Sequence, residues 1–130
     1  MLTPLLVAAL ALQSAPAAPA PAPAEAAPSL DALPIEQAAA ARCAMAFATI
    51  GRWQREGDAR GSDYPDMAST GGREFFVRVM AKLMEEAGYT RETIAALAAS
   101  EVERNDTPEG SARIAQMMPA CTMMKTAAGL

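Results

Sequence analysis

The chain has 130 residues, of which 52% are hydrophobic, 5% aromatic and 20% charged, and its formal net charge is −4 at pH 7. This acidic balance disfavours binding to nucleic acids or to anionic lipid surfaces, because both need clustered Lys and Arg. The sequence contains no histidine, so the usual general base, the commonest metal ligand and the ordinary pH switch are missing. We therefore expect a non-enzymatic protein of one domain that uses no cofactor and holds no metal.

Residues 1–17 have the pattern of a secretory signal peptide. The run Leu5–Leu12 is continuously apolar, but it is too short to cross a bilayer, which takes about 20 residues. Ala15-Pro16-Ala17 fits a cleavage site, although the first four residues carry no Lys or Arg. No cysteine lies near this site, so we expect no lipid anchor there and no stable membrane anchor after cleavage. The pattern predicts export to the periplasm.

Residues 18–34 are rich in proline and alanine. Proline lacks an amide donor and favours extended polyproline geometry. We therefore predict a disordered, semi-rigid linker at 18–34, followed by a helical domain at 35–127. A docking peptide is the less favoured interpretation, because this stretch has no aromatic or basic anchor.

The first helix is predicted from Ile35 to a point between Gln54 and Glu56, before Gly57. Gly51 weakens it, because glycine is a poor helix former. Cys43 lies near the middle of the apolar face. The residues that share this face at 100° per residue are Ile35, Ala39, Cys43, Ala46, Phe47 and Ile50.

Within the predicted helical domain, residues 57–72 form the only long stretch without a helical pattern. Glycine, proline and aspartate dominate it, which favours a loop, and loops of this length are usually functional or disordered. Trp53, Tyr64 and Phe75 lie in or beside the loop and are our candidate partner surface, because aromatic side chains often anchor interfaces. An equally acceptable interpretation is that the loop folds over these aromatic residues.

The clearest helix is predicted at residues 73–87, where Gly88 fits a C-terminal stop. Phe75 falls about 100° to the side of the apolar face, toward the charged residues. The predicted core residues of this helix are Phe76, Val79, Met80, Leu83 and Ala87, with Met84 at the edge.

Two more helices are expected in the last third of the chain. Thr90 is a suitable N-cap for the first of them, which is expected to end at Asn105-Asp106. Thr107-Pro108-Glu109 combines an N-cap, a proline at the first helical position and an acid in the first turn. We expect Pro119 to break or kink the last helix, with a short final segment running to about Thr126.

No segment alternates with period two, so no sheet is expected. The predicted fold is all-α, a small bundle of four to five helices stapled by one disulfide, Cys43–Cys121. These are the only cysteines, and an exported chain meets an oxidising compartment. A bond that closes such a long loop stabilises by about 4.5 kcal/mol in the chain-entropy account. Two buried free thiols are the less favoured interpretation, and a redox-active pair is disfavoured because the Cys-x-x-Cys spacing is absent.

The chain has nine methionines. Thioether ligands suit Cu(I), but methionine more often fills irregular cores, and no histidine supports a metal site. We favour core packing, with an adaptable apolar binding face as the second interpretation. The clustered methionines are Met117, Met118, Met123 and Met124.

The acids give no recognisable site. Asp58, Asp63 and Asp66 do not have the spacing of an EF-hand calcium loop, so a solvated loop is favoured. Glu101 falls at the edge of an apolar stripe, or is partly buried and paired with an arginine. A partly buried carboxylate can titrate above its solution value, but no second acid or nucleophile accompanies it in a recognisable spacing.

Three stretches carry a resemblance, namely Arg73–Arg78 (REFFVR), Leu83–Gly88 (LMEEAG) and Met118–Cys121 (MPAC). Together they resemble small exported proteins of unknown function from alphaproteobacteria, over roughly residues 40–125. The resemblance implies an all-helical domain located in the envelope. It supplies no catalytic or ligand-binding residues.

The leading functional expectation is a non-enzymatic binding or structural role in the periplasm, with a protein partner. A chaperone-like role in acid stress is suggested by the methionine-rich C-terminal region. A toxin-immunity-like role would use residues 57–72 or Phe75. A small enzyme is the least favoured alternative.

Overall fold

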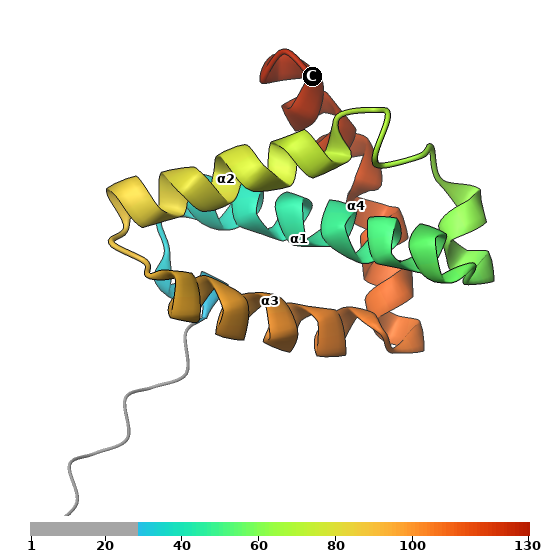
Figure 1. Ribbon diagram of the computed structural model, residues 1–130, viewed down its shortest axis with the longest axis horizontal. Coiled ribbons are helices and arrows are strands. Elements are labelled where there is room, and N and C mark those ends of the chain that lie inside the picture. The colour runs from blue at the N-terminus through green and yellow to red at the C-terminus, as the bar shows by residue number, and fades with distance from the viewer. Residues whose placement is uncertain (1–28) are drawn as a thin grey trace, which may run out of the picture.

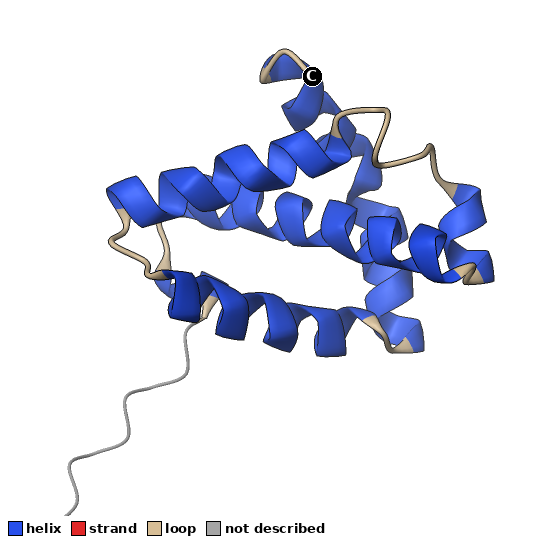
Figure 2. Cartoon of the chain, in the orientation of Figure 1, coloured by secondary structure: helices blue, strands red, loops and turns tan. Residues whose placement is uncertain are grey.

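The computed structural model describes residues 29–130. In this range the chain forms helices and no strand (Figure 2). The elements are η1 (Leu30–Ala32), α1 (Ile35–Glu56), η2 (Ala59–Asp63), α2 (Gly72–Glu86), α3 (Arg91–Asn105) and α4 (Pro108–Ala127), where η marks a 3-10 helix. The prediction of an all-α bundle is confirmed. The predicted signal peptide at 1–17 and the linker residues up to 28 lie outside the described residues.

Helix α1 is the centre of the fold. Helices α2 and α3 run alongside it and α4 crosses it (Figure 1), and α1 contacts all three as well as η1 and η2. Because it is enclosed from several sides, its buried residues are not confined to one stripe. They are Ala38, Ala41, Cys43, Ala44, Met45, Ala46, Phe47, Thr49, Ile50 and Trp53. The predicted face is confirmed from Cys43 to Ile50, but it is too narrow, and Ile35 at its start is 84% exposed.

The helix ends follow local signals in the sequence. Gly57 ends α1 with a φ of 71°, in the left-handed region that favours glycine. Thr90 Oγ1 accepts a hydrogen bond from the Thr93 amide at 3.1 Å, and Thr107 Oγ1 accepts one from the Gly110 amide at 3.0 Å. Both threonine caps are confirmed, and each satisfies an amide that has no partner within its helix.

Helix α2 packs through a face that is shifted from the predicted one. Phe75, expected toward the charged side, is 3% exposed, and its ring meets that of Phe47 edge to face with centroids 5.5 Å apart. Phe76 is only partly buried. The aromatic pair adds about 0.5–1.5 kcal/mol beyond the burial of its area, which favours turning Phe75 inward. As predicted, α2 also buries Val79, Met80 and Leu83.

The folded part begins before residue 35, so the predicted linker boundary is wrong. Leu30 is 2% exposed and belongs to the core. Asp31 Oδ1 pairs with Arg42 Nη2 at 2.5 Å, which ties η1 to α1. Burial of one leucine gives this segment a packed position that its proline and alanine content does not reveal.

The sequence predicts a break or a kink at Pro119. Helix α4 is continuous through this residue, so the break is wrong. A proline inside a helix costs about 3 kcal/mol. Ile114 before the proline and Cys121 after it are both fully buried, at 0% exposure. Tertiary contacts on each side therefore hold the helix together across the proline, whose own side chain is exposed.

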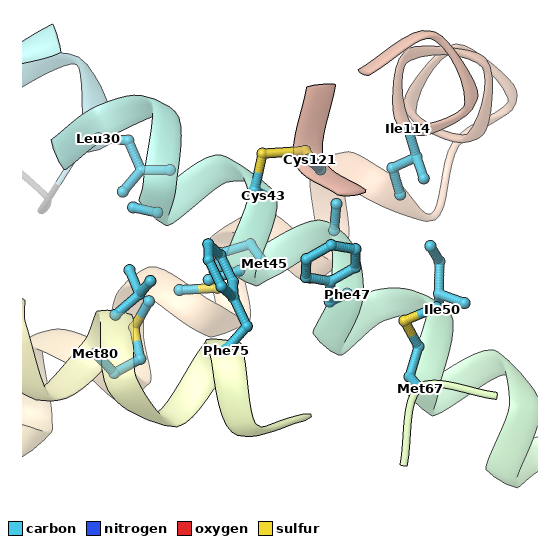
Figure 3. Packing of buried hydrophobic residues seen from close by; sticks show 14 of the residues in the cluster. Leu30, Cys43, Met45, Phe47, Ile50, Met67, Phe75, Met80, Ile114 and Cys121 are labelled. Carbon is cyan, nitrogen blue, oxygen red and sulfur yellow. A yellow bond between two sulfur atoms is a disulfide. The ribbon is translucent and has the colours of Figure 1, made fainter. Parts of the chain in front are cut away.

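The disulfide Cys43–Cys121 is present and joins the middle of α1 to the C-terminal half of α4, with a Cα–Cα distance of 5.2 Å. Figure 3 shows the bond among apolar side chains of the core, including Phe47 and Ile114. Cys43 and Cys121 are 4% and 0% exposed. Such burial keeps reductants and thiols away from the sulfur atoms, as expected for a structural rather than a redox-active pair.

Candidate functional site

The predicted surface of Trp53, Tyr64 and Phe75 does not exist as a surface. Trp53 is 0% exposed and Phe75 is 3% exposed, while Tyr64 is half-buried against the core. The Arg60 guanidinium lies 4.4 Å from the centroid of the Trp53 ring. The segment after α1 therefore folds over Trp53, as the alternative interpretation held, and of the three predicted aromatic residues only Tyr64 keeps exposed surface.

One glutamine side chain holds this segment in place. Gln54 Nε2 donates to the carbonyl oxygens of Gly61, Tyr64 and Pro65 at 3.0, 3.3 and 2.9 Å. Its Oε1 accepts a hydrogen bond from the Met67 amide at 2.9 Å. A side-chain amide has two N–H donors, so the three carbonyl oxygens share them, and both the nitrogen and the oxygen of Gln54 are engaged by residues 61–67. The long loop is thus an ordered wall beside α1.

Gly61 is required for this close approach. A Cβ at residue 61 would lie 2.8 Å from the Gln54 backbone nitrogen and 3.1 Å from the Trp53 carbonyl carbon. Real Cβ atoms do not come this close to backbone atoms. Only glycine lets η2 lie directly on α1.

A charged cluster closes the far end of α1. Asp106 accepts hydrogen bonds from Trp53 Nε1 at 3.1 Å and from Arg52 Nη2 at 2.6 Å, and Arg60 Nη2 lies 3.5 Å away. The Trp53 bond, followed by Arg52, lowers the pKa of Asp106 below its ordinary value. Hydrogen bonds from Arg60 lower the pKa of Asp58 to about 2, and the same contact raises the pKa of Arg60. These charges are mutually paired, which is the pattern of a structural network.

The candidate binding site is a hollow of about 580 Å³ beside the second half of α1, which we call the α1–α2 hollow. Its volume lies within the usual range of about 300–1,000 Å³ for small-molecule sites. Most of its walls are apolar. Its lining residues are Phe47, Ala48, Gly51, Gln54 and Arg55 from α1, Asp66, Met67 and Ala68 from the loop, and Arg73 and Phe76 from α2.

The charges in the α1–α2 hollow do not cancel. Asp66 Oδ2 accepts hydrogen bonds from the amide and the hydroxyl of Ser69 at 2.9 and 2.5 Å, and these bonds lower the pKa of Asp66. Arg55 and Arg73 form no side-chain hydrogen bond and no ion pair with any residue between 29 and 130. An otherwise acidic protein thus presents, beside an apolar floor, two guanidinium groups that have no partner in the described part of the chain.

Gly51 enlarges the α1–α2 hollow. It lies inside α1, where glycine is about 1 kcal/mol less favourable than alanine. A Cβ at this position would lie 3.4 Å from Arg55 Nη1 and 3.5 Å from Met67 Cβ, which are ordinary contacts. Helix packing therefore does not require glycine here. The missing side chain leaves open space in the hollow at the expense of helix stability.

A second hollow, of about 380 Å³, lies between the start of α1 and the end of α2. Two of its three charged groups, Lys82 and Glu86, are partnered, whereas Glu36 forms no ion pair with any residue between 29 and 130. Lys82 Nζ lies 3.6 Å from Glu86 Oε1, and Gln37 Nε2 donates to Glu86 Oε2 at 3.2 Å. This hollow is smaller than the α1–α2 hollow, and its one unpartnered charged group is an exposed acid, Glu36.

The remaining acids and methionines do not form a site. Glu101 is 9% exposed and accepts a hydrogen bond from Arg104 Nη1 at 3.0 Å, which matches the interpretation of a partly buried acid paired with an arginine. Between residues 29 and 130 no three potential His, Cys, Asp or Glu ligands come together in a way that could hold a metal ion. Met123 is 74% exposed. Three other methionines of the cluster, Met117, Met118 and Met124, pack against the core.

No helix in the described range is long and apolar enough to cross a membrane. No family model, curated protein or solved structure matches the chain. The resemblance to exported alphaproteobacterial proteins therefore stays a prediction.

Sequence patterns did not single out Gln54, Arg55 or Arg73. A loop-clamping glutamine and two exposed arginines look like ordinary polar residues of helix surfaces until the loop is placed. The one available signal was Gly51, a helix-weakening residue in the last third of the first helix.

Proposed function

We propose that the mature chain is a non-enzymatic binding protein of the bacterial periplasm, and that it recognises its ligand through the α1–α2 hollow. The buried disulfide supports an oxidising compartment, because such bonds persist in exported proteins. The apolar run near the N-terminus supports export by a signal peptide.

One observation carries the choice of site. The α1–α2 hollow combines apolar walls with Arg55 and Arg73, whose guanidinium groups lack partners among residues 29–130. Predominantly apolar concavities with a few convergent polar groups are the usual form of ligand sites. Gly51 keeps this space open at the expense of helix stability, which is the trade expected at functional positions.

The two alternative roles retain less support. A toxin-immunity-like role cannot use Phe75, because this residue is buried. The exposed residues of the loop between α1 and α2 remain as a contact surface for it. A chaperone-like role would need exposed methionines, and in the C-terminal cluster only Met123 is prominently exposed. Both would be assayed as protein–protein binding, which the capture experiment below also detects.

The test is capture from the envelope with matched baits. The full chain is expressed in a Gram-negative host, the fractions are separated, and the N-terminus of the mature protein is sequenced. Wild-type, Gly51→Leu and Arg91→Gln proteins are then immobilised, and retained proteins and small molecules are identified by mass spectrometry. Gly51→Leu fills the hollow, whereas Arg91 is exposed on α3 and does not line it.

We expect a cleaved protein in the periplasmic fraction. We also expect at least one species that wild-type and Arg91→Gln retain and Gly51→Leu loses. An uncleaved chain in the cytoplasmic fraction would overturn the location. Retention that is equal for all three baits would overturn the site.

A further inference from the structure

The shape and charge of the α1–α2 hollow restrict what it accepts. Its floor contains Phe47, Met67 and Phe76, of which Phe47 and Met67 are only 2% and 4% exposed. An apolar group therefore finds its accessible surface mainly on Phe76, Ala48 and Ala68. Methionine adapts its shape readily, so this floor suits a flexible chain better than one rigid ring system. The apolar part of a ligand would be buried here without displacing any hydrogen bond that the Gln54 side chain makes to residues 61–67.

The rim fixes the sign of the ligand charge. Arg55 and Arg73 contribute two positive charges and Asp66 one negative charge, so the lining carries a net charge of +1. The Asp66 carboxylate already accepts the Ser69 amide and hydroxyl, and its lowered pKa keeps it ionised at neutral pH. A ligand with a single negative charge would neutralise the site, whereas a cation would be repelled.

The donors also fix the kind of anion. A guanidinium group presents a planar fork of N–H donors that matches carboxylate and phosphate oxygens. A phosphate monoester carries between one and two negative charges at neutral pH, which exceeds the net charge of this lining. A carboxylate carries one negative charge, which matches the net charge of the lining.

We propose that the α1–α2 hollow binds a small amphiphile with one carboxylate, which Arg55 and Arg73 hold, and an apolar chain, which lies on Phe76, Ala48 and Ala68. This inference rests on the proposed function, because it names the ligand of the same site. It also gives Gly51 a role, since the absence of a side chain there leaves room for the apolar chain.

The probe is decanoate, titrated below its micelle concentration into the full mature chain and followed by calorimetry. Decan-1-ol lacks the charge, decyltrimethylammonium reverses it, and decyl phosphate carries a different anion. We expect decanoate to bind at least about tenfold more tightly than decan-1-ol, because two charge-assisted hydrogen-bond donors are engaged. We expect no binding of decyltrimethylammonium at the same concentrations.

Three variants localise the binding. Arg55→Gln and Arg73→Gln are each expected to weaken decanoate binding by about tenfold, and Gly51→Leu to abolish it. Arg91→Gln removes the same charge outside the hollow and is expected to bind as wild type does. Helical circular dichroism and the melting temperature of each variant are recorded, so that a loss of fold is not mistaken for a loss of ligand. Gly51→Ala, which raises helix propensity, provides a further variant that stays folded.

Several results would overturn this inference. Equal binding of decanoate and decan-1-ol removes the carboxylate site, and tighter binding of decyl phosphate reassigns the anion. Binding that survives both Gly51→Leu and the arginine substitutions places decanoate elsewhere. If decanoate does not bind while envelope capture still depends on the hollow, the ligand class is wrong and the proposed function stands.

Discussion

Asp106 joins three parts of the chain through one carboxylate. It accepts hydrogen bonds from Trp53 and Arg52 of α1 and lies 3.5 Å from Arg60 of η2, while it follows the last residue of α3. Its neighbour Asn105 donates to Thr49 Oγ1 at 3.2 Å inside the fold. This pair of residues therefore fixes the α3–α4 corner against the end of α1.

We predict that Asp106→Asn lowers the free energy of unfolding by about 1 kcal/mol at neutral pH. The amide oxygen still accepts from Trp53, but the charge that pairs with Arg52 and Arg60 is lost. The magnitude is kept small because the Asp106 side chain is 37% exposed and solvent screens its ion pairs. Urea denaturation of both proteins measures the difference, and Asp63→Asn, an exposed change in η2, serves as the control.

The same variant gives a pH dependence with a definite sign. Folding lowers the pKa of Asp106 below its ordinary value of 3.8, so its stabilisation is complete above about pH 4 and is lost as the pH falls through the folded pKa. The difference in the free energy of unfolding between wild type and Asp106→Asn should therefore disappear as the pH falls below 4. A difference in unfolding free energy that stays constant down to pH 2 would show that the ionised Asp106 carboxylate is not its cause.

The structural role of some single residues can be predicted from the sequence, whereas that of others cannot. The caps at Thr90 and Thr107 were predictable, because a cap depends on the residues within one turn. The burial of Trp53 and Phe75 was not, because it depends on which distant segment covers them. Arg60, which covers Trp53, carries no local signal of that contact.

At the scale of elements, the loop between α1 and α2 is attached to α1 through a few specific contacts. Its position relies on the Gln54 side chain and on the close approach of Gly61 to α1. The wall of the α1–α2 hollow that contains Asp66 and Met67 depends on this attachment. Local opening of this loop would therefore change the site.

We predict that Gln54→Ala lowers the free energy of unfolding by about 1–2 kcal/mol, because three carbonyl groups and one amide lose their partner. Hydrogen exchange of the Met67 amide should accelerate more than that of amides in the middle of α3. Mass-spectrometric exchange measures both. Gln116→Ala, an exposed glutamine change on α4, is the matched control, and equal Met67 exchange in the two variants would exclude the clamp.

Element boundaries were predictable where local chemistry decides them and wrong where packing decides. The end of α1 at Gly57 follows from the left-handed conformation that glycine adopts. Pro119 also has a strong local preference, but the burial of Ile114 and Cys121 outweighs it. The η1 segment shows the reverse case, because one buried leucine orders a stretch whose composition favours a linker.

At the scale of the molecule, the disulfide and the central helix act together. Cys43 lies in the middle of α1, which all other elements contact, and Cys121 lies on the helix that crosses it. The all-α class and the pairing were predictable, because the chain has only two cysteines and no strand pattern. The α1–α2 hollow was not, since it arises only when α1, α2 and the loop are assembled.

We predict that complete reduction lowers the free energy of unfolding by up to about 4.5 kcal/mol, because the unfolded chain regains the entropy of a loop of 78 positions. The urea midpoint should fall accordingly. Reductant should not change the midpoint of a Cys43→Ala, Cys121→Ala double variant. An unchanged wild-type midpoint after two thiols have been alkylated would show that the bond contributes nothing.

The staple also determines how the molecule bears mechanical load. A force applied to the two chain ends passes from Cys43 to Cys121 through the sulfur–sulfur bond and bypasses everything between them. Stretching then extends only the chain outside the ring. At about 3.4 Å per residue, the segment between the two cysteines has a contour length of roughly 270 Å, which stretching does not extend. The polypeptide that forms the α1–α2 hollow lies inside this shielded ring, so tension on the ends cannot draw it out while the bond is intact.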